Sequence, residues 1–488
     1  MRNSKKIIAS ALAVASLVSV ASCGGGGRTA QEGTTAATTT TPATTPETYD
    51  TDKGVQDAIA NVEIDKGEIN VTKKLKWMAW WPIDETSAEA ELFKATYGIP
   101  EEGDQSYGDY ANCITVYQNV AYNERYDKLG QLVSAGDSPD LFPFEIGYFP
   151  LSAYRGMFQS IDGIIDTNSE EWADTREVMD QFMWGGKNYC AITAVNPAYL
   201  YWYRRSVVQD AGLDDPYELY KAGKWNWDAF LDMADKFQKT GEGKYVCDGW
   251  YVARTLLCTT GVPLVGIENG KLQSNLNDPN VERAMEFISK LAQQNYRYPL
   301  EENNWSVNEK AWANGDTLFF VDGTWFYEGN GQKYMRKFEW GEDDIFMVPA
   351  PRDDAADAYY QEMKVDPVMF VAGSTNVDGF KAWTNCVLAA SKDPDANAAQ
   401  REKNKRDKYW TDEQLDFIDE LKNNALTAVF DFRNGISTSC ADTTSGNAPT
   451  DLVLVSPYRT TDESYTQLRA QYEGEINAAI DELNSTVS

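Results

Sequence analysis

The feature that most restricts the fold of this chain is the alternation of strand and helix patterns along residues 68–488. Residues 74–81 alternate apolar and polar side chains before a proline, which predicts a strand, and residues 113–119 predict a second one. Residues 86–97 and 122–136 have helical spacing of their apolar side chains. This alternation predicts an α/β architecture with helices flanking mixed sheets.

The rest of the chain repeats the pattern without any visible internal repeat. Further strands are predicted at 139–145, 188–193, 200–205, 316–323, 344–352 and 367–376, and further helices at 227–237, 278–295 and 465–483. A folded part of this length exceeds what one hydrophobic core usually serves, so two domains are expected.

The N-terminus has the layout of a secretory signal, with basic residues followed by a short apolar run at 7–20. Val20–Cys23 resembles the lipobox of bacterial lipoproteins, which implies cleavage before Cys23 and a lipid on its sulfur. An ordinary signal with an incidental cysteine is the alternative. We therefore expect a signal peptide at 1–22 and a disordered tether rich in threonine and glycine at 23–67.

Composition excludes several function classes. The net charge of −31 opposes binding to nucleic acid and to anionic lipid surfaces. The chain contains no histidine, which excludes Ser-His-Asp and Cys-His catalysis and metal sites built on histidine. No metal or cofactor motif is found. Disulfides and buried free thiols both remain open for the other six cysteines: Cys113, Cys190, Cys247, Cys258, Cys386 and Cys440.

Five local phrases resemble, in the expected order, the extracellular sugar-binding proteins of ABC importers, the group that includes maltose-binding protein. They are Ser134–Phe142, Gly185–Leu213, Gly223–Phe230, Phe319–Glu328 and Val348–Arg352. The sequence differs from the family pattern in three places. The segment Tyr189–Val195 (YCAITAV) replaces the family's usual Tyr-Gly-Leu/Ile-Pro, and the loops at 98–112 and 353–364 are unusual. These differences affect the inference of the ligand more than the inference of the fold.

The resemblance implies a two-lobed fold of the type II periplasmic binding proteins, in which each lobe is a mixed sheet flanked by helices. We expect the first lobe at 68–190 and 368–435, and the second at 191–367 and 436–488. The ligand would lie in the cleft between the lobes, and a hinge motion would close the cleft over it.

Aromatic and acidic residues gather where predicted strands end, which is where ligands bind in α/β sheets. A sugar offers apolar C–H faces to aromatic rings and hydroxyls to carboxylates and arginine. For any single tryptophan a place in the core is the competing interpretation, and for Asp366 it is a turn-capping role. The candidate ligand-binding residues are Trp80, Trp81, Asp84, Glu145, Tyr148, Trp250, Tyr251, Asp322, Trp325, Asp366 and Arg433.

These observations predict a monomeric, lipid-anchored receptor on the outer face of the cell membrane. It would capture a carbohydrate, most simply an oligosaccharide, and deliver it to ABC permease subunits without catalysing a reaction. Contact with the membrane would come through the lipid anchor only. An extracellular glycoside hydrolase using two carboxylates and a surface adhesin are the alternatives.

Overall fold

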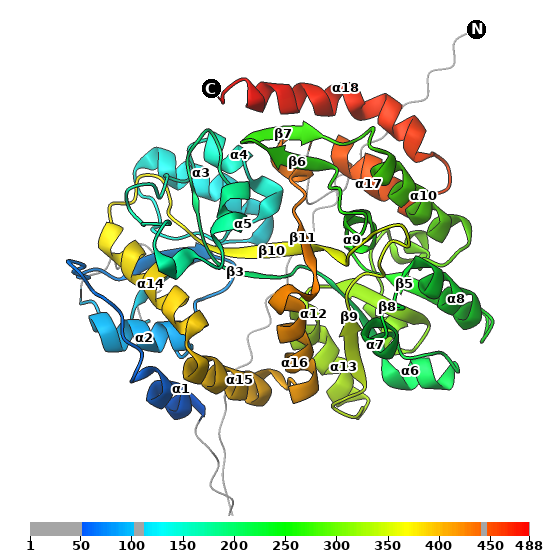
Figure 1. Cartoon of the computed structure of the whole chain (residues 1–488), viewed down its shortest axis with the longest axis horizontal. Helices are drawn as coiled ribbons and strands as arrows, with labels where there is room; N and C mark the ends of the chain where they lie inside the picture. Colours follow the sequence, from blue (N-terminus) through cyan, green and yellow to red (C-terminus); the bar gives the residue numbers. More distant parts are fainter. Residues whose placement is uncertain (1–50, 102–111, 441–446, 488) are drawn as a thin grey trace, which may run out of the picture. The chain divides into compact units, whose positions relative to one another are not determined.

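The computed structural model describes residues 51–101, 112–440 and 447–487 (Figure 1). The predicted signal peptide, Cys23 and the tether up to residue 50 lie outside the described residues, as does most of the unusual loop at 98–112. Helices and strands alternate along the described chain, as the patterns predicted. Every helix in these residues is too short or too polar to span a lipid bilayer.

A parallel pair of strands forms the first sheet. β1 (Leu75–Ala79) pairs with β2 (Thr115–Asn119) in register along its full length. α2 (Ala88–Tyr97) lies between them in sequence and packs against α14 (Val377–Lys392). α3 (Arg125–Ala135) follows β2. Because the two strands are parallel, the residues after both of them emerge at the same edge of the sheet.

A three-stranded sheet brings together segments far apart in the sequence. β10 (Tyr360–Met369) is its central strand, parallel to β11 (Thr427–Val429) and antiparallel to β3 (Cys190–Pro197). The register shifts between Asp366 and Pro367, where proline cannot donate a backbone hydrogen bond. Beyond β10, Phe370 bridges Leu141, which itself bridges Trp77 of β1. β10 therefore leads toward the first sheet.

A four-stranded mixed sheet has the strand order β5-β8-β4-β9. β5 (Tyr245–Asp248) and β8 (Thr317–Asp322) are parallel, whereas β4 (Leu200–Arg204) is antiparallel to β8 and to β9 (Ile345–Val348). Each residue of β8 is buried, as expected for a strand covered on both faces. α8 (Trp227–Gln238) packs against β5 and buries Trp227, Phe230 and Phe237.

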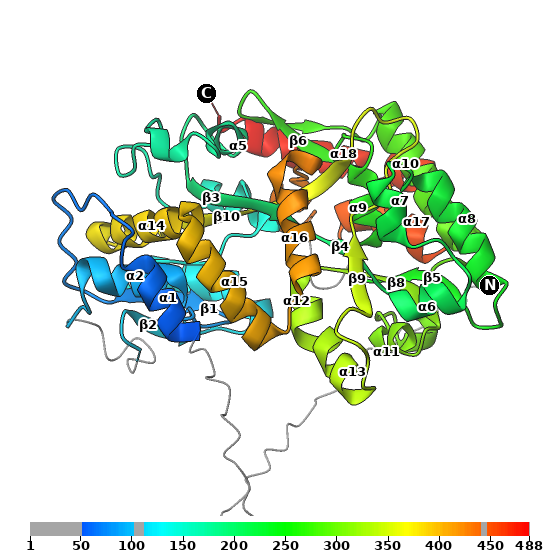
Figure 2. The same ribbon diagram turned by 60° about the horizontal axis from the view of Figure 1, so that its bottom comes forward.

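A hairpin and three helices complete this side of the protein. β6 (Val265–Glu268) and β7 (Lys271–Ser274) are antiparallel and are joined by Asn269 and Gly270, both with positive φ. α18 (Tyr465–Asn484) packs on β7, and the helices α10 (Pro279–Gln293) and α17 (Pro449–Arg459) pack together (Figures 1 and 2).

Further α-helices precede or connect these elements. The remaining α-helices are α1 (Thr51–Ile59), α4 (Leu151–Tyr154), α5 (Arg176–Gln181), α6 (Arg205–Asp210), α7 (Pro216–Lys221), α9 (Val252–Cys258), α11 (Glu309–Ala313), α12 (Thr324–Phe326), α13 (Gln332–Lys337), α15 (Pro394–Lys408) and α16 (Asp412–Glu420).

Two expected elements differ from the structure. The predicted strand at 139–145 is reduced to isolated bridges at Leu141, because the prolines at 139 and 143 limit ladder hydrogen bonding. The strand predicted at 367–376 lies earlier, at Tyr360–Met369. The first residues of β10 are polar although two of them are buried, so the search for apolar runs did not include them in the predicted strand.

The expected end of the tether is corrected by α1, which lies inside the range 23–67. Val55 of this helix is fully buried, and α1 packs on α15. Asp52 is also 3.1 Å from Arg406 of α15. The folded part therefore extends to the N-terminal side of residue 68, because α1 is amphipathic and finds an apolar surface to cover.

α16 was expected in the first lobe, but it packs against elements of the expected second lobe. Phe417 of α16 contacts Tyr217 of α7 and Phe346 of β9, which belong to the expected second lobe. Arg205 of α6 adds an ion pair with Glu413 at 2.7 Å. The expected lobe boundaries stay a prediction.

All six cysteines within the described residues are free thiols. Cys113 is exposed, whereas the other five are buried. Burial raises the pKa of the Cys247 thiol to about 12, so it is a neutral apolar side chain at physiological pH. Of the two interpretations that the sequence left open, disulfides and buried free thiols, these five cysteines agree with buried free thiols.

Candidate functional site

Aromatic and charged side chains gather at the edge where β1 and β2 end. Trp80 and Trp81 follow β1, and Tyr122 and Arg125 follow β2. The Trp80 ring meets the rings of Trp81 and Tyr122 edge to face, with centroid distances of 4.5 and 5.1 Å. With Glu145 these four residues form the first cluster.

A bidentate ion pair organises the first cluster. The Arg125 guanidinium donates to both carboxylate oxygens of Glu145, at 2.5 and 2.8 Å, and the Tyr122 hydroxyl donates to Glu145 at 3.1 Å. The guanidinium also lies 3.6 Å from the Tyr122 ring centroid and 5.3 Å from that of Trp80. Since Arg125 is 1% exposed, the pair is held in a fixed geometry.

Tyr148 supports this cluster from behind. Its ring stacks on Tyr126 of α3 with a centroid distance of 3.7 Å. The Arg125 guanidinium lies 5.0 Å from the Tyr148 ring centroid. Tyr148 is therefore placed to position the ion pair of Arg125 and Glu145.

A second cluster forms at one edge of the four-stranded sheet from Tyr199, Tyr251 and Trp325. Tyr251 follows the parallel strand β5, Trp325 follows β8, and Tyr199 precedes the antiparallel strand β4, so all three emerge at the same edge. Tyr199 and Tyr251 stack with centroids 3.6 Å apart, and Trp325 meets both rings edge to face at 6.0 and 6.2 Å. We call the stacked tyrosines the tyrosine platform.

Two glycines make the loops of this edge possible. A Cβ atom on Gly323 would lie 2.2 Å from the Trp325 ring, because the indole folds back over this residue. Gly249 has a φ of 128°, and a Cβ there would lie 2.3 Å from the Val321 carbonyl oxygen. Any larger residue at 323 would move the indole away from the tyrosine platform.

Two buried carboxyl groups lie beneath the same edge. Asp322 accepts a hydrogen bond from the Gly323 amide at 2.8 Å, and burial raises its pKa to about 7. Asp248 accepts from the amides of Asn308 and Gly249, and burial raises its pKa to about 6. At neutral pH Asp322 is therefore divided between its acid form, which donates a hydrogen bond, and its carboxylate, which only accepts.

Several aromatic side chains at these edges are much more exposed to solvent than those of the core. The exposed fractions are 43% for Trp81, 46% for Tyr122, 50% for Trp250 and 47% for Trp325, while Trp202 is fully buried. Exposed large aromatic side chains at strand ends are candidates for ligand contact, because leaving them in water is unfavourable without a partner.

The two clusters lie within electrostatic range of each other. Burial raises the pKa of Tyr251 well above its usual value, and the phenol groups of Tyr199 and of Tyr122 from the first cluster contribute to the rise.

Other predicted residues have different surroundings. Asp84 forms an ion pair at 2.8 Å with Lys403, which is 5% exposed. Arg433 is 3% exposed and pairs with Asp431 at 2.9 Å. Asp366 is exposed on β10 and accepts a hydrogen bond from the Asn196 amide at 2.5 Å. These three residues are not part of either cluster.

The sequence did not predict three residues of the clusters, namely Tyr122, Arg125 and Tyr199. The strand-end rule that selected Trp80 also applies to Tyr122 and Arg125, which follow β2 at the same edge. No such signal marks Tyr199, because it lies at the start of a strand and reaches the edge only through the antiparallel direction of β4.

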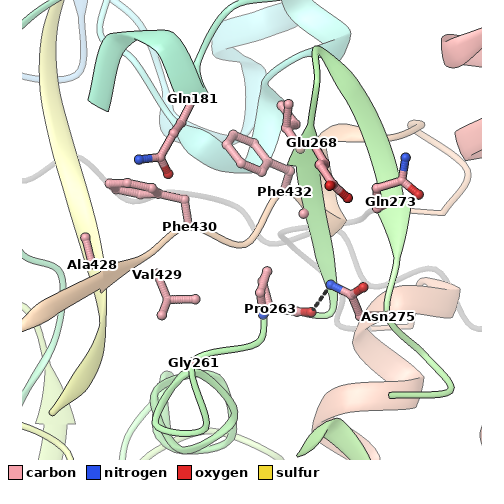
Figure 3. A pocket seen from close by; sticks show the side chains of 12 residues that line it. Gln181, Gly261, Pro263, Glu268, Gln273, Asn275, Ala428, Val429, Phe430 and Phe432 are labelled. Carbon is pink, nitrogen blue, oxygen red and sulfur yellow. Dashed lines mark hydrogen bonds between the residues drawn. The ribbon is translucent and has the colours of Figure 1, made fainter. Parts of the chain in front are cut away.

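Two hollows lie away from the clusters. One, of about 270 Å³, is bordered by Gln181 of α5, by Phe430 and Phe432 after β11, and by the β6–β7 hairpin (Figure 3). The other, of about 360 Å³, is lined by polar residues around Asn308. Neither includes a residue of the two clusters. We favour the clusters as the ligand site, because they combine exposed rings with fixed polar groups.

Comparison with known proteins gives one family and many related structures. The family described as bacterial extracellular solute-binding protein matches residues 109–401. None of the curated proteins matches the sequence significantly.

Solved structures of similar fold include three named binding proteins. The GacH receptor of Streptomyces glaucescens GLA.O, solved unliganded and with acarbose, has 15% identity and a TM-score of 0.58 over 84% of this chain and 99% of its own. The sugar-binding protein MalE of Xanthomonas citri has 14% identity and a TM-score of 0.58, over 85% and 98%.

The third is the ABC transporter associated binding protein of B. animalis subsp. lactis Bl-04, solved with beta-1,6-galactobiose. It has 14% identity and a TM-score of 0.55, over 85% and 98%. At this level of identity the likeness establishes the fold, which is the expected two-lobed α/β fold.

Proposed function

Because the chain belongs to the family of bacterial extracellular solute-binding proteins, we propose that it captures a carbohydrate between the two aromatic clusters and delivers it to an ABC importer. Members of this family bind solutes outside the cytoplasm and catalyse no reaction. Several proteins of the same fold were solved with sugars, among them maltotetraose and alpha-D-tagatose.

The observation that carries the proposal is the pairing of exposed rings with fixed polar groups. Trp81 and Trp325 offer flat apolar faces to solvent. The exposed Tyr122 hydroxyl and the Glu145 carboxylate that Arg125 fixes lie in the first cluster, and Asp322 lies beneath Trp325. Rings and hydroxyl groups of a sugar require this combination. Because Glu145 neutralises Arg125, the first cluster favours a neutral ligand over an anionic one.

The size of the site supports an oligosaccharide rather than a monosaccharide. Each cluster contains an exposed tryptophan, on the edge of a different sheet, and each can stack one sugar ring. Closure of two lobes over such a ligand requires that it contact the closed form better than the open one. Residues of both clusters would supply those contacts.

Delivery to a permease accounts for the N-terminal segment. A lipid on Cys23 would hold the receptor at the outer face of the membrane and raise its effective concentration near the permease subunits. The signal layout and the lipobox resemblance support this part of the proposal. We propose that the receptor acts as a monomer.

A sugar panel tests the proposed function. We would titrate the protein by isothermal calorimetry with maltotetraose, cellotetraose, xylotetraose, beta-1,6-galactobiose, cycloalternan, acarbose and tagatose, and record its thermal unfolding with each. A ligand at a hundredfold excess over its Kd should stabilise the protein by about 2.7 kcal/mol.

Chromatography of the sugars after incubation completes the test. The receptor should return each sugar intact, whereas shortened products would identify a hydrolase. Failure of every member of the panel to bind at millimolar concentration would contradict the proposal and favour an adhesin.

A further inference from the structure

Arg254 connects the tyrosine platform to the central sheet. It lies on α9 one helical turn after Tyr251, so both side chains are on the same face of this segment. Its guanidinium is 5.4 Å from the Tyr199 ring centroid and forms an ion pair with Glu362 of β10. The exposed fractions of the two side chains in this pair are 13% and 1%.

Glu362 depends on Arg254 for its stability as a buried anion. Two nitrogens of the guanidinium approach the same oxygen, Oε1. The other oxygen, Oε2, is buried and has no hydrogen-bond partner among the described residues. Burial raises the pKa of Glu362, and the charges of Arg254 and Arg433 oppose that rise. Removing Arg254 alone would therefore leave an uncompensated buried charge.

The backbone makes a second connection between β10 and the platform. The Ala198 amide donates to the Glu362 carbonyl at 3.1 Å, and the Gln361 side chain donates to the Tyr199 carbonyl at 3.1 Å. Tyr199 is thus held on β10 through its main chain, while Arg254 holds its ring. The neighbouring strand β3 and the bridge at Phe370 continue the connection toward the first sheet.

On the basis of the proposed function, we propose that Arg254 is a positioning residue for ligand binding: its ion pair with Glu362 fixes the tyrosine platform, on which Trp325 rests, to strand β10. Arg254 itself lies beneath the rings and need not touch the ligand. Contact of a sugar with Trp325 would then be transmitted through the tyrosine platform and Arg254 to β10, which leads toward the first sheet.

A double substitution tests this role without leaving a buried charge. Arg254→Gln combined with Glu362→Gln replaces the ion pair by a neutral amide pair of similar shape. We expect it to melt near the wild-type temperature but to bind the tightest sugar of the panel about tenfold more weakly, because the ion pair that fixes the tyrosine platform to β10 and the cation over Tyr199 are both lost. Arg254→Lys keeps a cation there and should bind within about threefold of wild type.

A matched control uses a second arginine of the same kind. Arg204 pairs with Asp344 at 2.9 Å and lies 3.7 Å from the Trp340 ring centroid, away from both clusters. Arg204→Gln with Asp344→Asn should leave sugar affinity unchanged.

The results separate the inference from the proposed function. Wild-type affinity in the Arg254 double variant, or an equal loss in the control, overturns the positioning role while sugar binding by the wild type upholds the function. If the wild type binds no sugar of the panel, both fall together.

Discussion

Replacement of Asp322 by asparagine should stabilise the protein, and the gain should depend on pH. The carboxyl group is 6% exposed beneath Trp325, and burial raises its pKa from 3.8 to about 7. Asparagine can keep the acceptor for the Gly323 amide and resembles the protonated acid on the other side. The substitution therefore removes the cost of ionising a buried group and little else.

The sign and the size follow from proton linkage. The folded-state pKa is raised, so the folded protein binds more protons than the unfolded chain between about pH 4 and pH 7, and wild-type stability falls across that interval. A pKa rise from 3.8 to about 7 corresponds to about 4 kcal/mol once the group is ionised. Asp322→Asn should thus equal wild type near pH 4 and exceed it by about 4 kcal/mol above pH 7.

Chemical denaturation of both proteins from pH 4 to pH 8 measures the difference. Asp248→Asn provides the comparison, because both oxygens of Asp248 accept from backbone amides and one would face an NH2 group after substitution. The raised pKa of Asp248, about 6, predicts a gain of about 3 kcal/mol that the lost hydrogen bond largely offsets. Parallel stability curves for wild type and Asp322→Asn would refute the reasoning.

Three further predictions concern the ligand and the anchor. Trp81→Ala or Trp325→Ala should weaken sugar binding about tenfold without loss of fold, because both rings are nearly half exposed; unchanged calorimetric affinity in both would remove the stacking assignment. Gly323→Ala should weaken binding similarly by displacing the Trp325 indole, with wild-type affinity as the contrary result. Cys23→Ser should move the protein from the membrane fraction to the medium and abolish incorporation of labelled palmitate; retention of the label would disprove the lipid site.

Local patterns were sufficient for the architecture and for five of the eight residues of the two clusters. The period of apolar residues predicted most helices and strands, and the strand-end rule selected Trp80, Trp81, Glu145, Tyr251 and Trp325. The rule works because side chains after parallel strands emerge at a common edge whatever the rest of the fold does.

Partners distant in sequence decided the rest. Asp84 was a predicted ligand-binding residue, yet it pairs with Lys403 more than three hundred residues away. Arg254 pairs with Glu362 of β10, more than a hundred residues further along the chain. No periodicity encodes which two segments will face each other.

The sequence by itself determined that the chain is an α/β protein with a signal-like N-terminus, an acidic surface and aromatic rings at strand ends. Only the tertiary structure decided which rings stack, which charges are neutralised and which carboxyl groups are buried enough to shift their pKa. The physical reason is range: backbone propensity and periodicity act over a few residues, whereas ring stacking, ion pairing and desolvation depend on neighbours that folding alone supplies.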